Sequence, residues 1–181
     1  MTISDNGNLL DRRWHLGQTP HEVSIVELEY ALFRIYESFG RWQRECLAAV
    51  SGQELSTSDN AVLHIIRLKD RPKAVTEVAQ LLNRDDVANL QYSVRKLLTA
   101  GLIEKVTGNK RKGVQYRTTD KGREVTEMYA KLRQRALIAL TEAVPGLEDQ
   151  VEEATKTLNL MNGIYEQAAH VTRTHRQPMD D

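Results

Sequence analysis

Apolar residues recur at alternating intervals of three and four along the first long segment of the chain. The residues of this stripe are Ile25, Leu28, Leu32, Ile35, Phe39, Trp42, Cys46 and Ala49. Such a heptad spacing places them on one side of a single helix of about 28 residues. The helix is predicted to begin near Glu22 and to end at Ser51-Gly52, because glycine readily terminates helices.

Two further amphipathic segments follow later in the chain. The first runs from Asp120 until Pro145-Gly146 interrupts it, with apolar residues at Val125, Met128, Leu132, Ala136 and Ala139. The second repeats the heptad spacing at Leu147, Val151, Ala154, Leu158, Met161, Tyr165 and Ala168. Because a long helix cannot bury such a stripe alone, the three helices predict a helical platform, most simply a homodimer interface. The alternative is that they pack only on one another within one chain.

A series of shorter elements lies between the long helices. Ser56 and Asp59 form an N-terminal capping pattern for a helix that Arg71-Pro72 closes. Its buried side is predicted to hold Val62, Leu63, Ile66 and Leu68. The next elements are two short helices, a strand, a loop and a returning strand, at 75–83, 86–98, 102–106, 107–113 and 114–117. This order is typical of a winged helix-turn-helix, whose second short helix enters the DNA major groove.

The elements together predict a mainly α fold with a small β-wing of two to three strands. A winged helix-turn-helix core is flanked by long dimerisation helices, with about six helices in all. The predicted divisions are an N-terminal arm at 1–21, a dimerisation helix at 22–52, a winged helix DNA-binding domain at 53–119, C-terminal dimerisation helices at 120–171 and a tail at 172–181. The arm either lies over a partner subunit or is disordered.

Charge supports a nucleic-acid partner only locally. The whole chain has 25 cations and 25 anions, so its net charge says nothing about DNA. Between Val87 and Arg117, by contrast, seven cations stand against the single anion Glu104. Three of the cations are consecutive in the wing loop, at Lys110, Arg111 and Lys112. Because phosphate neutralisation depends on local cations, this segment is predicted to contact double-stranded DNA.

Helical geometry divides the second short helix into a buried face and a DNA-facing side. Leu90, Val94, Leu97 and Leu98 share the buried face, and Asp86 is predicted to cap the helix. The residues predicted to contact DNA are Ala88, Asn89, Gln91, Tyr92, Arg95 and Lys96 on this helix, with Lys110, Arg111, Lys112 and Arg117 on the wing. Asn89, Gln91 and Tyr92 are the predicted base readers, because residues near the start of a recognition helix reach base edges most readily and amides can bind adenine bidentately. Arg95 and Lys96 are predicted to contact phosphates.

Several short motifs resemble those of the MarR family of bacterial winged-helix transcription regulators, from about residue 22 to about residue 169. The matching residues are Ala61-Val-Leu63, Val78-Ala79, Leu97-Leu-Thr-Ala-Gly-Leu-Ile-Glu-Lys105 and Thr119-Asp-Lys-Gly122. The resemblance implies a dimeric regulator that binds a pseudo-palindromic operator. It also implies a small aromatic or phenolic effector between the dimer platform and the DNA-binding lobe, with Tyr36, Trp42, His64 and Arg67 as candidate ligand-binding residues.

The chain departs from the family pattern in the wing. Family members often carry an Asp-x-Arg pair, in which the aspartate orients the arginine toward the minor groove. Here the corresponding residues are Lys110-Arg111-Lys112, so the orienting carboxylate is missing. Arg111 can still reach the minor groove, but the resemblance does not imply how it is held there.

No sequence pattern indicates an enzyme, a cofactor or a metal site. A glycine-rich phosphate loop, a zinc-binding spacing and a nucleophile elbow are all missing, and the five histidines do not cluster. The single cysteine, Cys46, excludes an intramolecular disulfide and is predicted to be buried, with a redox role as the alternative. Without an apolar leader or a membrane-length apolar run, the sequence predicts a cytoplasmic protein.

The predicted function is a dimeric, sequence-specific transcription regulator that acts as a repressor and is relieved by a small ligand. The alternative is a winged-helix interaction protein or antirepressor that does not bind DNA. The three consecutive wing cations favour the regulator, because a protein without DNA contacts has no need of them.

Overall fold

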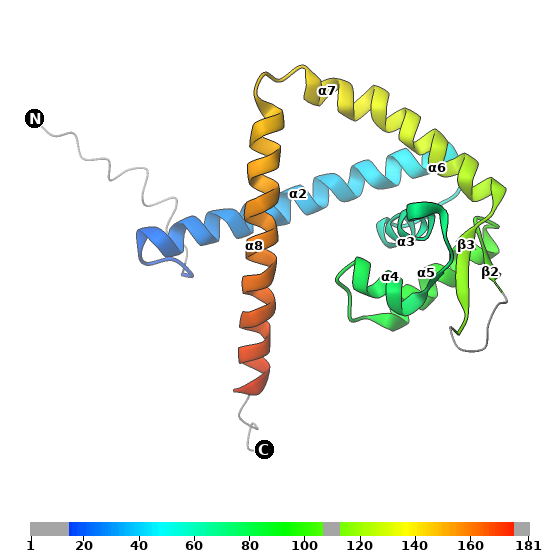
Figure 1. Cartoon of the computed structure of the whole chain (residues 1–181). Helices are drawn as coiled ribbons and strands as arrows, with labels where there is room; N and C mark the ends of the chain where they lie inside the picture. Colours follow the sequence, from blue (N-terminus) through cyan, green and yellow to red (C-terminus); the bar gives the residue numbers. More distant parts are fainter. Residues whose placement is uncertain (1–14, 107–112, 176–181) are drawn as a thin grey trace, which may run out of the picture. The chain divides into compact units, whose positions relative to one another are not determined.

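The computed structural model describes residues 15–106 and 113–175, which form two compact units divided between Lys131 and Leu132. The first unit begins with the long helix α2 (Pro20–Ser51). It continues with α3 (Thr57–Arg67), a 3-10 turn (Leu68–Asp70), β1 (Lys73–Ala74), α4 (Val75–Leu81), α5 (Val87–Thr99), β2 (Ile103–Val106), β3 (Gln115–Thr118) and most of α6 (Asp120–Arg133). The helices α3, α4 and α5 lie beside the strands, as Figure 1 shows. The predicted fold class is confirmed.

The second unit is helical. After α6 the helix passes into a π-helical turn (Gln134–Ile138) and a short helix α7 (Ala139–Glu142), and α8 (Leu147–Thr174) follows. The expected single helix from Asp120 to Val144 is therefore interrupted. The break at Pro145-Gly146 is as predicted, and Gly146 adopts a left-handed conformation with φ of 72°. No helix in the described ranges has the length and apolar character needed to cross a membrane.

Side-chain caps begin the two first helices. Thr19 and Glu22 form a capping box at the start of α2, and Ser56 and Asp59 form the predicted one at the start of α3. In each box the hydroxyl accepts from a backbone N–H while the carboxylate accepts from the N-cap N–H. The α2 helix ends as predicted, with Gly52 in the left-handed region.

The sheet is a three-stranded antiparallel sheet with the order β1-β3-β2. In the β2–β3 pair Glu104 lies opposite Arg117, and in the β1–β3 pair Lys73 lies opposite Tyr116. The sheet thus reaches the upper limit of the predicted two to three strands. The third strand was not placed by the sequence because two residues are too short to show an alternating pattern.

A buried lysine closes α3 earlier than the sequence predicts. The helix ends at Arg67, not at Arg71-Pro72, and Lys69 and Asp70 then adopt positive φ angles. Lys73 Nζ donates to the carbonyl oxygens of Ile66 and Arg71, each at 3.2 Å, and also to that of Leu68. These bonds satisfy carbonyls that the helix end leaves without partners. Leu68, which was expected to be buried, is 44% exposed because it lies in the turn after the helix.

The hydrophobic core of the first unit lies between α3, α5 and the start of the sheet. Its fully buried residues include Val62, Leu63 and Ile66 of α3 together with Leu90, Val94 and Leu97 of α5. Leu102 and Ile103 continue the core from the end of α5 into β2. This core fixes which side of α5 turns away from the protein.

The start of α6 packs directly on the turn that joins α5 to β2. Thr119 donates its N–H to the Leu102 carbonyl at 3.1 Å and its hydroxyl to the Gly101 carbonyl at 2.6 Å. A Cβ atom on Gly122 would lie 2.0 Å from the Leu102 carbonyl oxygen. Only glycine permits this approach of one backbone to another.

Replacement of Gly122 by alanine should therefore destabilise the protein. The added methyl group meets backbone that cannot move like a flexible side chain, so we expect unfolding free energy to fall by about 3 kcal/mol. Urea denaturation followed by circular dichroism measures the loss. Glu124→Ala, at an exposed position on the same helix, is the matched control. Equal stabilities for the two variants would contradict the close approach.

Candidate nucleic-acid interface

The helix α5 presents a polar face because its other face is buried. Asp86 is its N-cap and accepts from the Asn89 N–H at 3.1 Å, as the sequence predicted. Leu90, Val94 and Leu97 are buried, and Ser93 joins them with 2% exposure. Leu98, expected in the core, is only half-buried. The exposed residues of the helix include Ala88, Asn89, Gln91, Tyr92 and Arg95.

The predicted base readers differ in their surroundings. The side-chain amide of Asn89 donates to Asp86 Oδ2, so the capping carboxylate holds the amide beside the start of the helix. Tyr92 is 58% exposed, and the guanidinium carbon of Arg95 lies 6.0 Å from the centre of its ring. Gln91 is exposed one turn after the N-cap region, where base edges are most accessible to a recognition helix.

Lys96 is bound to the protein itself. Its Nζ donates to the Glu54 carbonyl oxygen at 3.0 Å and to Asp59 Oδ2 at 3.2 Å. Its neighbour Arg95 is exposed. Both residues were predicted to contact phosphates. In the structure, only Arg95 is exposed, whereas the Lys96 ammonium is hydrogen-bonded within the protein.

On the wing, the described cations are Lys105 and Arg117. Arg117 Nε donates to Glu104 Oε1 at 2.6 Å, as their opposite positions in the β2–β3 register allow. This ion pair neutralises one of the seven local cations. The side chains of Lys110, Arg111 and Lys112 lie outside the described residues.

Two grooves flank α5. One, of about 500 Å³, lies toward the sheet and is lined by Gln91, Arg95, Lys105 and Tyr116 among others. The other, of about 440 Å³, lies toward the segment before α3 and is lined by Gln53, Tyr92, Arg95 and Lys96 among others. Arg95 lines both grooves, so its guanidinium is accessible from either side of the helix.

The turn between α4 and α5 is fixed by backbone and side-chain bonds. Asn83 adopts a positive φ of 50°, and the Arg84 N–H donates to the Ala79 carbonyl at 2.9 Å. Arg84 Nη1 donates to the Ser58 hydroxyl at 2.7 Å, which ties this turn to α3. This contact could not be predicted from the sequence, because the two residues are 26 positions apart and neither belongs to a local motif.

Asp59 is a buried carboxylate with several donors. Its exposed fraction is 1%. Burial alone would raise the pKa of Asp59, but the hydrogen bonds from the Ser56 N–H, from nearby hydroxyls and from Lys96 outweigh burial, so that the pKa lies below its usual range. The carboxylate therefore remains charged inside the protein at neutral pH.

The candidate ligand-binding residues lie on two helices. Tyr36, which is 71% exposed, and Trp42, which is half-buried, belong to α2. On α3, the ring of His64 packs edge-on against Tyr129 at 4.5 Å, and Arg67 forms ion pairs with Asp70 at 3.1 Å and Glu127 at 3.8 Å. Burial lowers the pKa of His64, and its Nε2 atom is buried without a hydrogen-bond partner in the described structure.

Cys46 is 2% exposed, as expected, and burial raises the pKa of its thiol. A buried thiol with a raised pKa is a poor nucleophile, because the reactive species is the thiolate. The structure therefore favours the structural role that the sequence predicted.

The lowered pKa of His64 should make stability depend on pH. As pH falls through about 6.5 the unfolded chain binds a proton at this residue while the folded protein does not, so unfolding becomes easier. Stability should therefore fall between about pH 7.5 and pH 5.5, and His64→Phe should reduce that fall. Thermal melts at the two pH values test this. An unchanged pH dependence in the variant would contradict the assignment.

Comparison with known proteins agrees with this geometry. A family model described as "Winged helix DNA-binding domain" matches residues 55–122. No curated protein matches the sequence.

Solved structures with the same fold include transcription regulators bound to DNA. A mutant MarR from E. coli complexed with operator DNA is 21% identical, with a TM-score of 0.61, over 75% of this chain and 95% of that one. MosR from M. tuberculosis in complex with DNA is also 21% identical, with a TM-score of 0.57, over 80% and 96%.

A third similar structure contains small molecules. This is MarR from Staphylococcus aureus in complex with salicylate and kanamycin, which is 19% identical, with a TM-score of 0.61, over 83% of this chain and 95% of that one. At these identities the likeness is one of fold. Residues 55–122 match the winged helix model, and the chain has the fold of structures named MarR-family transcription regulators, which confirms the resemblance at the level of fold.

Proposed function

We propose that this winged helix protein is a sequence-specific DNA-binding transcription regulator that acts as a homodimeric repressor. The observation that carries the proposal is the division of α5 into a buried apolar face and an exposed face with amide, phenol and guanidinium groups. This is the arrangement that a recognition helix requires in the major groove. The DNA complexes of MarR and MosR, which share the fold, support it.

Within this helix, Gln91 is the proposed reader of a base edge. Its amide can donate to and accept from adenine at once, and its exposed position near the start of α5 leaves both groups available. Asn89 donates one of its two amide hydrogens to Asp86, so its second amide hydrogen and its carbonyl oxygen remain for a base. Arg95 is the proposed phosphate contact, together with Lys110, Arg111 and Lys112 of the wing loop.

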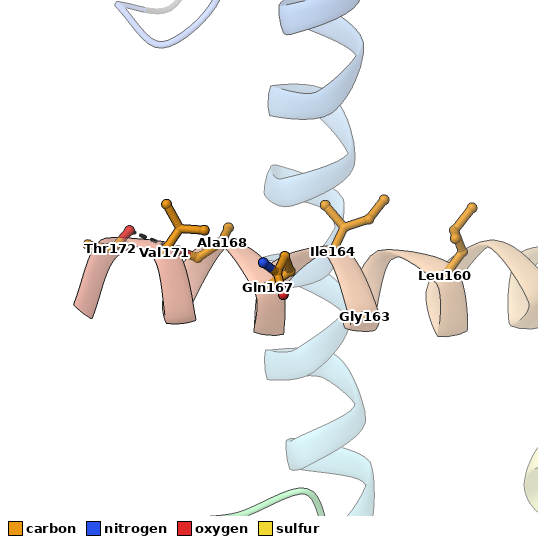
Figure 2. A pocket seen from close by; sticks show the side chains of 7 residues that line it. All are labelled: Leu160, Gly163, Ile164, Gln167, Ala168, Val171 and Thr172. Carbon is orange, nitrogen blue, oxygen red and sulfur yellow. Dashed lines mark hydrogen bonds between the residues drawn. The ribbon is translucent and has the colours of Figure 1, made fainter. Parts of the chain in front are cut away.

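Exposed apolar side chains support a homodimer. On α2, Phe33, Ile35, Tyr36 and Phe39 are each more than half exposed. On α8 no residue is buried within the chain, and Figure 2 shows Leu160, Ile164, Ala168 and Val171 projecting to one side of the helix. They line an apolar groove of about 600 Å³. Large apolar surfaces of this kind mark protein interfaces, and two-fold symmetry would match a palindromic operator.

Relief of repression by a small aromatic ligand is the remaining part of the proposal. Of the two compounds in the S. aureus MarR complex, salicylate is a small aromatic carboxylate, so a protein of this fold can bind a ligand of that class. In this chain the orphaned Nε2 of His64 and the guanidinium of Arg67 are polar groups that a phenol or carboxylate could bind.

Substitution of Gln91 by alanine tests sequence reading. We expect affinity for the preferred duplex to fall by about 1–3 kcal/mol and affinity for random DNA to change little, because only a base contact depends on sequence. The preferred site is first selected from a random duplex library, and competition titrations then measure both affinities. The exposed Gln150 of α8, replaced by alanine, is the control.

If the native protein selects no DNA sequence, the regulator proposal is wrong and the winged-helix interaction protein takes its place. If Gln91→Ala lowers both affinities equally, the side chain contacts phosphate and not a base.

The homodimer is tested by light scattering. The native protein at micromolar concentration should have twice the 20.6 kDa chain mass. Replacing Leu160 and Ile164 together by glutamate should produce monomers. In a dimer, each chain would have to bury two carboxylates in the interface without hydrogen-bonding or cationic partners. Gln150→Glu with Asn159→Glu adds the same charge on the same helix at residues that do not line the apolar groove, and should leave the dimer intact. A native monomer would contradict the proposal.

A further inference from the structure

A polar cluster joins the first turn of α3 to α5 inside the winged helix domain. Arg84 donates to Ser58 Oγ at 2.7 Å, and the hydroxyl oxygens of Ser58 and Ser93 lie 3.1 Å apart. Beside them, Asp59 accepts from Lys96 at 3.2 Å. The cluster therefore contacts the residues before, within and near the end of α5.

The centre of this cluster is withdrawn from water. Asp59 is 1% exposed and Ser93 is 2% exposed. A carboxylate in such a position is stable only with a charged or hydrogen-bonding partner, because burial removes its hydration. The ammonium of Lys96 is the cationic partner, and 38% of the Lys96 side chain is exposed.

Lys96 is also tied to the backbone before α3. A lysine ammonium has three donor hydrogens, and here one is directed to Asp59 and a second to the Glu54 carbonyl at 3.0 Å. A phosphate contact would compete with these two bonds. Arg95, one position earlier, is exposed on the same side of the fold.

We propose that Lys96 is a positioning residue of the DNA-binding site, which holds the end of α5 on the first turn of α3 through Asp59 and does not itself bind DNA. At the other end of α5, the hydrogen bond from Arg84 to the Ser58 hydroxyl ties the preceding turn to the same part of α3. Base recognition tolerates errors of only about 0.5 Å, so the two anchors set where Gln91 meets a base. This inference rests on the proposed function for its DNA readout.

The first test compares two neighbouring cations. Lys96→Met keeps the aliphatic stem and removes the ammonium, and Arg95→Met does the same one position earlier. We expect Lys96→Met to weaken binding to the selected duplex about tenfold. The slope of log affinity against log salt should stay unchanged in Lys96→Met. In Arg95→Met the slope should become smaller by about 0.9 for each phosphate that the guanidinium neutralises in the native protein.

Two further variants test whether Lys96 acts through Asp59 and not through a phosphate. Lys96→Arg should restore binding, since a guanidinium can also bind the carboxylate. Asp59→Asn should lose the same affinity as Lys96→Met, and the double variant should lose no more than either alone. Thermal melts identify any variant that fails to fold, in which case Lys96→Met alone decides the outcome.

A measurement without DNA separates this inference from the proposed function. Hydrogen exchange of the last-turn amides of α5 should become faster in Lys96→Met and stay as in the native protein in Arg95→Met. If the native protein binds no duplex, the proposed function fails, and exchange still tests the anchor.

A smaller salt slope in Lys96→Met would overturn the inference, since it would reveal a phosphate contact. Unchanged exchange together with unchanged affinity would overturn it as well.

Discussion

The packing of α5 on α3 is the contact on which the rest of the candidate site depends. Leu90, Val94 and Leu97 fill the space beside Val62 and Ile66, and this contact determines which residues of α5 turn outward. An error in the rotation of this helix would move an amide from the base edge into solvent. The polar cluster around Asp59 adds directional hydrogen bonds, which fix the position of α5 along α3 more closely than non-directional hydrophobic packing does.

The helices of the second unit contain no buried residue, and like α2 of the first unit they expose large apolar side chains. Among them, Leu140 is 69% exposed and Leu160 is 67% exposed. Burial of a leucine of this kind contributes about 1.5–3 kcal/mol, so that a surface with several of them gains much from a second copy. The proposed dimer would bury these helices, while the core between α3, α5 and the sheet is buried within one chain.

Much of the fold could be predicted because its signals are local. Heptad spacing located α2 and α8, capping residues located α3 and α5, and the order of elements after α5 located β2 and β3. The contacts of Lys73 and Lys96 could not be predicted, since each joins groups that only the folded chain brings together. The π-helical turn at Gln134–Ile138 was missed for a related reason, because apolar spacing does not reveal which backbone hydrogen bond a residue makes. Which base α5 reads is still a proposal, because a side chain alone does not determine its partner.

The buried ammonium of Lys73 also gives the protein a built-in chemical reporter. Its nitrogen donates to three carbonyl oxygens and the residue has no exposed surface, so that an amine-directed acylating reagent cannot reach it in the closed fold. Modification requires the turn after α3 to open and β1 to leave the sheet. The rate of labelling at this one lysine therefore records the openings, local or global, that expose the edge of the winged helix domain.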